Sequence, residues 1–486
     1  MAEQVRTGRP SKALRRALVP FALAQFICSF AGSNMNVMIT DISEDLGTTV
    51  QGVQLAITIF LLVMAALMIP GGKLTDIYGR KRCFNVGLVI YGIGALISAV
   101  SPNLGILIIG NSILEGVGTA LLIPPVYILT TVLFTNLTSR ARAFGAISAF
   151  GGIGAATGPL IGGFITTAVS WRASFLLQAV IIGLILVLSR RGVNDPIPAD
   201  PTRPFDVGGA VLSSVGLILV VTGILAADDN LWLMLGLLVA GALVLAVFFV
   251  SMRSKERAGK EALLSTALFR NRTSNLGLVT QNAQWLMLMG TSFVVSAYLQ
   301  VVRGYNAVET GVVFTATTVG LLTSSLAAER LAGRRAQRTL ILAGFVVTLV
   351  GVGILLTLVS RRPSAWAFTP GLFFIGLGLG GMLTPSVNLV QASWGERLQG
   401  EISGVSRSVS NLGSSLGAAL AGTILVAGIT KTPERSYALA MVTVAAAGLI
   451  GLGAAVFLPR TAGGTPPTTT PGEAPSGDAL PTTTSP

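Results

Sequence analysis

The chain has 486 residues, of which 52% are hydrophobic and only 11% are charged. It contains no histidine and two cysteines, so the usual metal ligand and the usual general base near neutral pH are missing. This composition argues against an enzyme, a disulfide framework or a zinc site, and we expect neither a metal nor a cofactor. The formal net charge of +13 could indicate a nucleic-acid partner, but its distribution along the chain favours membrane topology.

Apolar stretches of about 20 residues, long enough to cross a bilayer core of roughly 30 Å, recur from end to end. They predict an all-α polytopic membrane protein embedded in the lipid bilayer. The fourteen helices are expected at 18–40, 52–72, 84–101, 104–128, 142–167, 173–189, 207–226, 231–251, 276–301, 310–328, 339–360, 366–391, 402–427 and 437–458.

An even number of spans places both termini on one side of the membrane, and the basic residues indicate which side. With both termini in the cytoplasm, 27 of the 33 Lys and Arg residues fall in cytoplasmic segments or toward the cytoplasmic ends of spans. The outer loops then hold only Arg172, Arg303, Arg361, Arg362, Lys431 and Arg435. This asymmetry is the positive-inside bias. It predicts a multi-pass protein of the cytoplasmic membrane and explains the basic excess without a nucleic acid.

The chain divides into five parts by composition. A cytoplasmic segment at 1–17 precedes an N-terminal six-helix bundle at 18–189. Two inserted helices with their cytoplasmic connectors occupy 190–275, and a C-terminal six-helix bundle occupies 276–458. The tail at 459–486 is rich in Thr and Pro, so it cannot bury a core and is expected to be disordered.

A charged connector between the second and third spans has an ordered pattern. Gly72 permits close helix approach, Asp76 can meet backbone N–H groups or Arg80, and Gly79 can adopt a turn conformation closed to other residues. These four residues predict a polar latch on the cytoplasmic side, although a plain basic turn that sets topology would look similar. A weaker copy lies at 329–335. Such paired repeats predict a transporter with its substrate site between the halves, near the bilayer midplane.

The stretch 145–163 has a glycine pattern inside an apolar segment. Three of its glycines are spaced four apart and therefore share one helix face, which lets another helix approach closely in lipid, while the proline bends the helix. An ordinary packing stripe of small residues is the alternative. The residues of the motif are Gly145, Gly154, Gly158, Pro159, Gly162 and Gly163.

These motifs together resemble the major facilitator superfamily, specifically its fourteen-span drug:proton antiporter group. The glycine pattern is similar to the antiporter motif of its fifth helix. Further matches are Trp171-Arg172 through Phe175, the segment from Tyr298 to Gly311, and Gly404 through Gly417. The resemblance extends to about residue 458. It implies a major facilitator fold of two six-helix bundles plus two inserted central helices, alternating access, and multidrug efflux of the kind that confers antibiotic resistance.

The chain departs from this family at two places. The resemblance implies an acid in the first span and an arginine in the fourth, where this chain has Ala31 and Ser112. Glu115 is then the clearly intramembrane carboxylate, near mid-depth, with Asn111 on the same face. A carboxyl group removed from water holds its proton more tightly, so Glu115 is the proton-coupling candidate. Two other roles stay open: a protonated linker between helices, or recognition of a substrate cation.

Polar stripes at helical spacing mark the candidate substrate cavity, although each could instead link neighbouring helices. They predict a large, mildly polar lining suited to amphipathic, apolar or weakly cationic compounds. Arg407 is expected at a cytoplasmic gate. The cavity candidates are Gln25, Ser29, Ser33, Asn34, Asn36, Asn111, Gln281, Asn282, Gln284 and Trp285.

The leading hypothesis is a monomeric exporter of hydrophobic or amphipathic small molecules in exchange for protons. Two alternatives stay open: an exporter of a lipid or cell-envelope precursor, and a non-transporting membrane sensor or scaffold on the same fold.

Overall fold

The computed structural model describes residues 12–134, 137–196, 198–202, 204–226, 230–332, 336–359, 364–394 and 398–460. Its long helices are α1 (Lys12–Asn34), α3 (Val50–Tyr78), α4 (Arg80–Ala99), α6 (Gly116–Leu133), α7 (Leu137–Ala168), α8 (Trp171–Gly192), α9 (Val207–Leu225), α10 (Leu231–Arg257), α11 (Arg272–Ala297), α12 (Ala307–Ala332), α13 (Gln337–Val359), α14 (Thr369–Ala392), α15 (Gln399–Gly428) and α16 (Pro433–Val456). Shorter helical segments are η1 (Met35–Val37), α2 (Ile39–Asp45), α5 (Leu104–Leu107), η2 (Ile108–Glu115), η3 (Thr266–Phe269), η4 (Tyr298–Val302) and η5 (Ala365–Phe368).

Within the described residues, thirteen helical stretches are each long and apolar enough to cross a bilayer, and α7 brings the number to fourteen if its two segments, bent by 41°, count as one span. The predicted all-α polytopic fold is therefore confirmed. Of the predicted terminal segments, only the parts from Lys12 onward and up to Arg460 are described. The side chains of the weaker repeat at 329–335 lie outside the described part of the chain.

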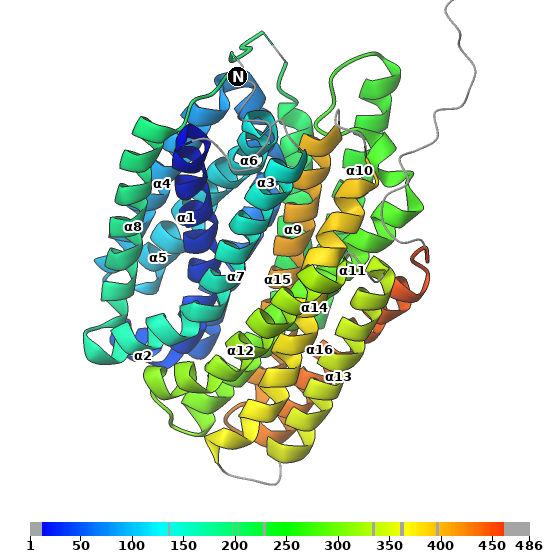
Figure 1. Cartoon of the computed structure of the whole chain (residues 1–486). Helices are drawn as coiled ribbons and strands as arrows, with labels where there is room; N and C mark the ends of the chain where they lie inside the picture. The colour runs from blue at the N-terminus through cyan, green and yellow to red at the C-terminus, as the bar shows by residue number, and fades with distance from the viewer. Residues whose placement is uncertain are drawn as a thin grey trace, which may run out of the picture.

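The helices pack as two bundles (Figure 1). In the first, α1 packs on α7 and α8, and α4 packs on α6 and α8. In the second, α11 packs on α15 and α16, and α14 packs on α12 and α13. Two seams join the bundles, one where α3 meets α15 and one where α7 meets α12.

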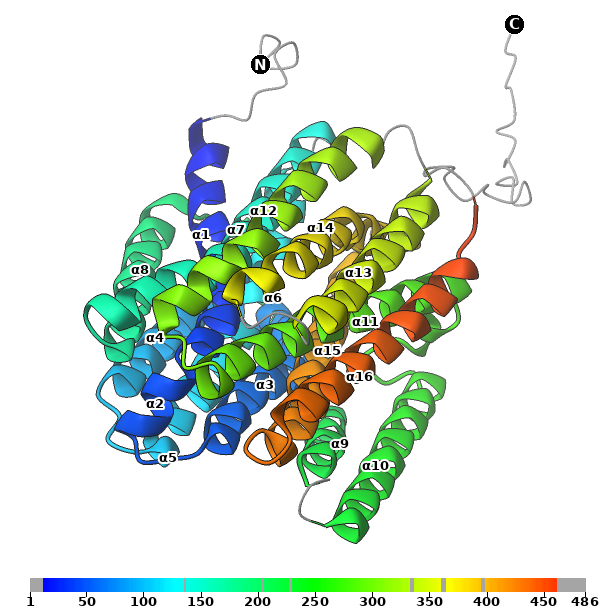
Figure 2. The ribbon, with the colours of Figure 1, turned by 90° about the horizontal axis from the view of Figure 1, so that it is seen from below.

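Helices α9 and α10 form a pair at the outside of the two bundles (Figure 2). Helix α9 contacts both α3 and α15, so it covers one seam, whereas α10 packs mainly on α9. Only 6% of the apolar stretch of α10 is buried inside the protein, and its side chains Trp232 and Leu243 are exposed. Such an apolar outer surface is what a bilayer requires of a peripheral helix.

Two local features differ from the sequence-based expectation. Helix α3 continues to Tyr78 instead of ending near residue 72: it runs through Pro70, Gly71 and Gly72 and ends at Gly79, whose φ is +91°. The fourth span is also not a uniform α-helix. Its segment from Ile108 to Glu115 is π-helical, a rare form that is frequent at functional sites.

Candidate functional site

A cavity of about 50 Å³ lies between the two bundles. Helices α1, α3, α6, α7, α11 and α15 all contribute to its wall. Among the predicted cavity residues, Gln25 and Ser29 reach it from α1 and Trp285 reaches it from α11. A drug-sized ligand needs a pocket of roughly 300 Å³ or more, so this conformation holds the central site nearly closed.

A polar cluster on the wall connects the two bundles. The Gln25 amide donates to the Ser29 hydroxyl over 3.2 Å, and the Tyr127 hydroxyl donates to Gln25 Oε1 over 3.1 Å. From the other bundle, Arg407 places its guanidinium carbon 4.7 Å from the centre of the Tyr127 ring. Arg407 therefore lies in the wall of the central cavity, whereas the sequence analysis expected it at a cytoplasmic gate.

The remaining predicted residues of the first span lie outside the cavity wall. Ser33 donates to the Phe30 carbonyl within α1, and the Asn34 amide donates to the Ser174 hydroxyl of α8 over 3.0 Å. The carbonyl of Asn36 accepts a hydrogen bond from Gln300 over 2.9 Å. Asn34 and Asn36 therefore link α1 and η1 to neighbouring elements in this conformation, whereas Ser33 bonds within its own helix.

The polar stripe of α11 makes hydrogen bonds inside the second bundle. The Gln281 amide donates to the Ser386 carbonyl and its oxygen accepts from Ser406. Asn282 donates to the Val409 carbonyl, and Gln284 accepts from the Ser386 hydroxyl. These three side chains tie α11 to α14 and α15, and of this stripe only its neighbour Trp285 lines the cavity.

Glu115 and Asn111 lie on η2, inside the first bundle. Both side chains are fully buried, and their polar atoms make no hydrogen bond of good geometry to another described residue. Tyr91 and Ser98 of α4 lie beside the Glu115 carboxyl group, and the Tyr91 hydroxyl donates to Gln178 over 2.7 Å. Glu115 thus faces α4 and not the central cavity.

Thr119 and Cys28 connect the backbone of Glu115 with the cavity wall. The Thr119 hydroxyl donates to the Glu115 carbonyl over 2.8 Å and accepts a long contact of 3.7 Å from the Cys28 thiol. Cys28 itself lines the cavity. At the two positions of departure from the family, Ala31 is buried and Ser112 donates to the Ala56 carbonyl over 2.7 Å.

The glycine motif of α7 is where α1 packs. A Cβ atom at Gly154 would overlap the Phe26 carbonyl, and one at Gly158 would overlap the Ser33 hydroxyl. A Cβ atom at Gly162 would lie 3.0 Å from the Cβ of Asn34. The helix also bends by 41° between its segments Ala143–Ala155 and Thr157–Ala168, one turn before Pro159, which lacks the N–H that would continue the ladder.

The end of this motif also reaches the other bundle. A Cβ atom at Gly163 would overlap the carbonyl of Ala307 on α12, and one at Gly311 would lie 2.5 Å from the Pro159 carbonyl oxygen. Close by, Gln300 accepts from the Thr40 backbone N–H over 3.1 Å. These contacts close the end of the molecule at which α7 ends and α12 begins. In contrast, a Cβ atom at Gly145 would meet nothing within 4 Å.

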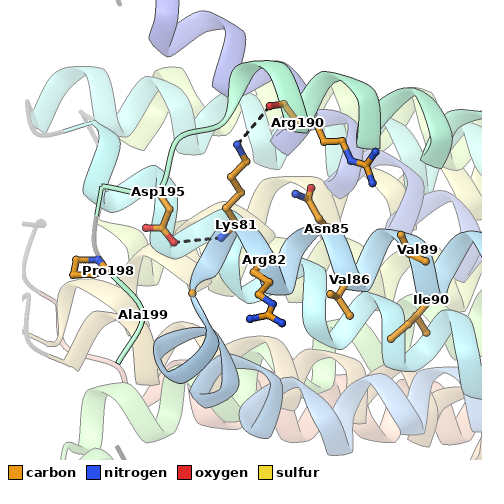
Figure 3. Close-up of a pocket in the computed structure, with 11 residues that line it drawn as sticks. Lys81, Arg82, Asn85, Val86, Val89, Ile90, Arg190, Asp195, Pro198 and Ala199 are labelled. Atoms are coloured by element: carbon orange, nitrogen blue, oxygen red, sulfur yellow. Dashed lines mark hydrogen bonds between the residues drawn. The ribbon is translucent and has the colours of Figure 1, made fainter. Parts of the chain in front are cut away.

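The predicted latch is an ion-paired turn. Asp76 accepts from the Arg80 guanidinium over 2.8 Å, and Gly79 provides the left-handed turn between α3 and α4. Asp195, which the sequence did not single out, accepts from the backbone N–H groups of Arg80 and Lys81 at the start of α4 (Figure 3). A carboxylate there is favoured by the free N–H groups and the helix dipole.

A second missed pair, Lys73 and Glu401, crosses between the bundles. The ammonium group of Lys73 on α3 lies 3.2 Å from the Glu401 carboxylate on α15, and Glu401 also accepts from the Ser265 backbone N–H over 2.9 Å. The Asp76–Arg80 pair stays within the first bundle and its connector. Among the described residues at this end of the molecule, Lys73, one turn before Asp76, makes an ionic link between the bundles.

A wider recess of about 660 Å³ lies on the outside of the first bundle, beside the start of α4 (Figure 3). Its rim carries Lys81, Arg82 and Arg190, and Val86 and Val89 supply its apolar side. None of the predicted cavity residues lines it. This recess is separate from the space between the bundles.

Comparison with known proteins identifies the relatives of this architecture. The family model of the Major Facilitator Superfamily matches residues 21–269 and 204–418. A puromycin resistance protein of Streptomyces alboniger is 30% identical over 84% of this chain and 81% of its own. A probable actinorhodin transporter of Streptomyces coelicolor is 30% identical over 86% of this chain and 73% of its own.

A solved structure shows the same arrangement of helices. A peptide transporter of the POT type in complex with sulfate superposes with a TM-score of 0.66, covering 91% of this chain and 95% of the transporter, at 17% identity. At this identity the likeness concerns the fold alone.

Proposed function

Because the chain belongs to the Major Facilitator Superfamily of membrane transporters, we propose that it exports hydrophobic or amphipathic drug-like small molecules by alternating access. The observation that carries this proposal is the polar and apolar cavity between the two bundles. The relatives named for puromycin resistance and actinorhodin transport support export of bioactive small molecules.

The proposed transport cycle moves the bundle of residues 18–189 against that of residues 276–458. One end of the molecule is closed by small residues, at the contacts of Gly163 with Ala307 and of Gly311 with Pro159. Close contacts between small residues can separate without stranding a buried charge. We place this end on the outer side of the membrane, because the basic residues concentrate at the other end.

Glu115 is the proton-carrying group in this proposal. A carboxyl group enclosed without a cation beside it is stable in its neutral, protonated form, so it must hold a proton in the conformation described. The backbone carbonyl of Glu115 is linked through Thr119 to Cys28 on the cavity wall, whereas its carboxyl group lies beside Tyr91 and Ser98 of α4. Movement of the fourth span relative to α1 and α4 during the cycle would admit water to the carboxyl group and allow it to release the proton.

The test uses proteoliposomes with an imposed pH gradient and a panel of puromycin and anthracene derivatives that bear a carboxylate, a carboxamide or an ammonium group. The wild-type protein should accumulate at least one compound against its concentration gradient. Glu115→Gln should abolish this accumulation and retain downhill exchange, since a neutral amide preserves the shape of the side chain but cannot carry the proton.

Glu434→Gln serves as the matched control, because Glu434 is an exposed acid at the start of α16. This variant should accumulate substrate like the wild type. Undiminished accumulation by Glu115→Gln would rule out its proton-carrying role. Transport by the wild type that ignores the pH gradient would rule out proton antiport while leaving export itself intact.

A further inference from the structure

Arg407 places a positive charge in the wall of the central cavity. It extends from α15 toward the first bundle, and its guanidinium lies over the Tyr127 ring at 4.7 Å. No described carboxylate forms an ion pair with it, although other arginines such as Arg80 and Arg172 have acidic partners. An ionisable group inside a membrane protein without a partner marks a functional site.

Among the described residues that line the cavity, none is acidic. The carboxyl group of Glu115 is buried inside the first bundle beside Tyr91 and Ser98 of α4, and Glu115 does not line the cavity. The cavity therefore has a net positive charge from Arg407 alone. A cationic substrate would be repelled by this charge, whereas an anion would supply the missing partner.

The rest of the cavity wall suits a flat apolar group. Trp285 and Met289 reach it from α11, and Met64 and Met68 reach it from α3. Methionine side chains adapt their shape and make favourable contacts with aromatic rings, and tryptophan stacks on flat ring systems. Ser410 and Ser414 line the cavity on the α15 side, where their hydroxyl groups donate to carbonyl groups of their own helix.

We propose that the substrate of this transporter is an amphipathic organic monoanion with a flat ring system, whose acidic group binds Arg407 and whose rings pack against Trp285 and the methionines. This inference deepens the proposed export function and rests on it. It also replaces the weakly cationic compounds among those that the sequence led us to expect, because that expectation placed Arg407 at a gate and gave the cavity few fixed charges.

The position of Arg407 also gives the anion a role in coupling the bundles. Tyr127 and its partner Gln25 belong to the first bundle, whereas Arg407 belongs to the second. An acidic group that binds Arg407 in a bidentate manner would contact both bundles at once. Arg407 is therefore the residue through which an acid is distinguished from its neutral analogue.

The test measures binding to the full-length protein in lipid nanodiscs by equilibrium dialysis. The probes are an anthracene carboxylate, its carboxamide and the matching anthracenylmethylammonium cation, which share one ring system. The wild type should bind the carboxylate at least about 10-fold more tightly than the carboxamide, since a hydrogen-bonded charge contributes the free energy of a tenfold change or more. The cation should bind most weakly.

Two variants of Arg407 isolate the charge. Arg407→Gln should weaken binding of the carboxylate by about 10- to 100-fold and change binding of the carboxamide by less than about 2-fold, which also shows that the cavity is folded. Arg407→Lys should retain most of the preference for the acid, because it keeps the charge. Arg272→Gln, which neutralises an exposed arginine at the start of α11, should leave all three affinities unchanged.

The outcomes separate this inference from the proposed function. Equal affinities of the wild type for the three probes, or equal losses for carboxylate and carboxamide in Arg407→Gln, would overturn the anionic specificity. Export of neutral or cationic compounds would then leave the proposed function standing. Failure of the wild type to move any compound in proteoliposomes would overturn the function itself.

Discussion

Adding one methyl group at Gly163 should shift the equilibrium between the closed and the open form of the end of the molecule where α7 meets α12. Gly163→Ala places a Cβ atom on the carbonyl oxygen of Ala307, at the seam between α7 and α12. Both partners of this contact are backbone atoms of long helices, so neither can rotate away as a flexible side chain would. The strain exists only while this end of the molecule is closed.

The size of the effect follows from the cost of overpacking. One extra methyl group in a well-packed interface costs about 1–3 kcal/mol. Because this cost applies to the closed conformation alone, the ratio of open to closed molecules should rise by roughly 5- to 150-fold. The first bundle itself should remain folded, since the neighbouring contacts of Gly154 and Gly158 with α1 are unaffected.

The measurement is the distance between spin labels at Val169 and Val312, both exposed residues near this end of α7 and α12. Labels attach to introduced cysteines, and the native Cys28 and Cys83 are buried. The variant should populate longer distances than the wild type. Gly145→Ala is the control on the same helix, because a Cβ atom there meets nothing within 4 Å, and alanine stabilises a helix by roughly 0.5–1 kcal/mol relative to glycine.

A distance distribution in Gly163→Ala that matches the wild type would refute the idea that backbone contact closes this end. The same change in Gly145→Ala would show that the effect comes from helix stability and not from the seam.

Three further predictions concern the charged contacts. Lys73→Gln and Glu401→Gln should each weaken the contact between the bundles at the opposite end. In a double-mutant cycle of thermal stability, the interaction energy should be about 0.2–1 kcal/mol, a small value because both side chains are partly exposed; strictly additive effects of the two substitutions would contradict the ion pair. Asp206→Asn should destabilise the α9–α10 pair by about 1–3 kcal/mol, because the buried Asp206 carboxylate pairs with Lys255; hydrogen exchange in these two helices should become faster. Burial alone raises the pKa of Asp206, but Lys255 and backbone N–H groups hold that pKa below its usual value. The hydrogen bond from Arg172 lowers the pKa of Asp45, so the stability advantage of the wild type over Asp45→Asn should be full at neutral pH and decline as the pH falls below about 4; an advantage that does not vary with pH would refute this.

Much of the architecture could be predicted from the chain alone, because lipid imposes simple rules. Length and hydropathy predicted fourteen spans, and the helices occur at those places with ends shifted by a few residues in either direction. The spacing of Gly154 and Gly158 predicted a face for close helix packing, which is where α1 lies. Arg80 was one of the two partners foreseen for Asp76, since the two residues lie close together in sequence on either side of the turn at Gly79.

The candidate site was harder to predict, because a polar residue in a membrane span can either line a cavity or bond to a neighbouring helix. Gln281 and Gln284 have the same composition and spacing whether they face a cavity or a neighbouring helix, and here they bond to α14 and α15. Glu115 was singled out for its depth, yet its direction toward α4 depends on the π-helical turn that carries it.

The sequence by itself determined that this chain crosses the membrane many times, which helix faces are smooth, and where charge is missing from the expected family positions, because these properties depend on local composition and on helical spacing. Only the tertiary structure decided that Asp195 caps α4, that Lys73 meets Glu401, and that Arg407 faces the cavity without an acidic partner among the described residues. Such contacts join residues that lie far apart along the chain, and their geometry is set by how the bundles pack.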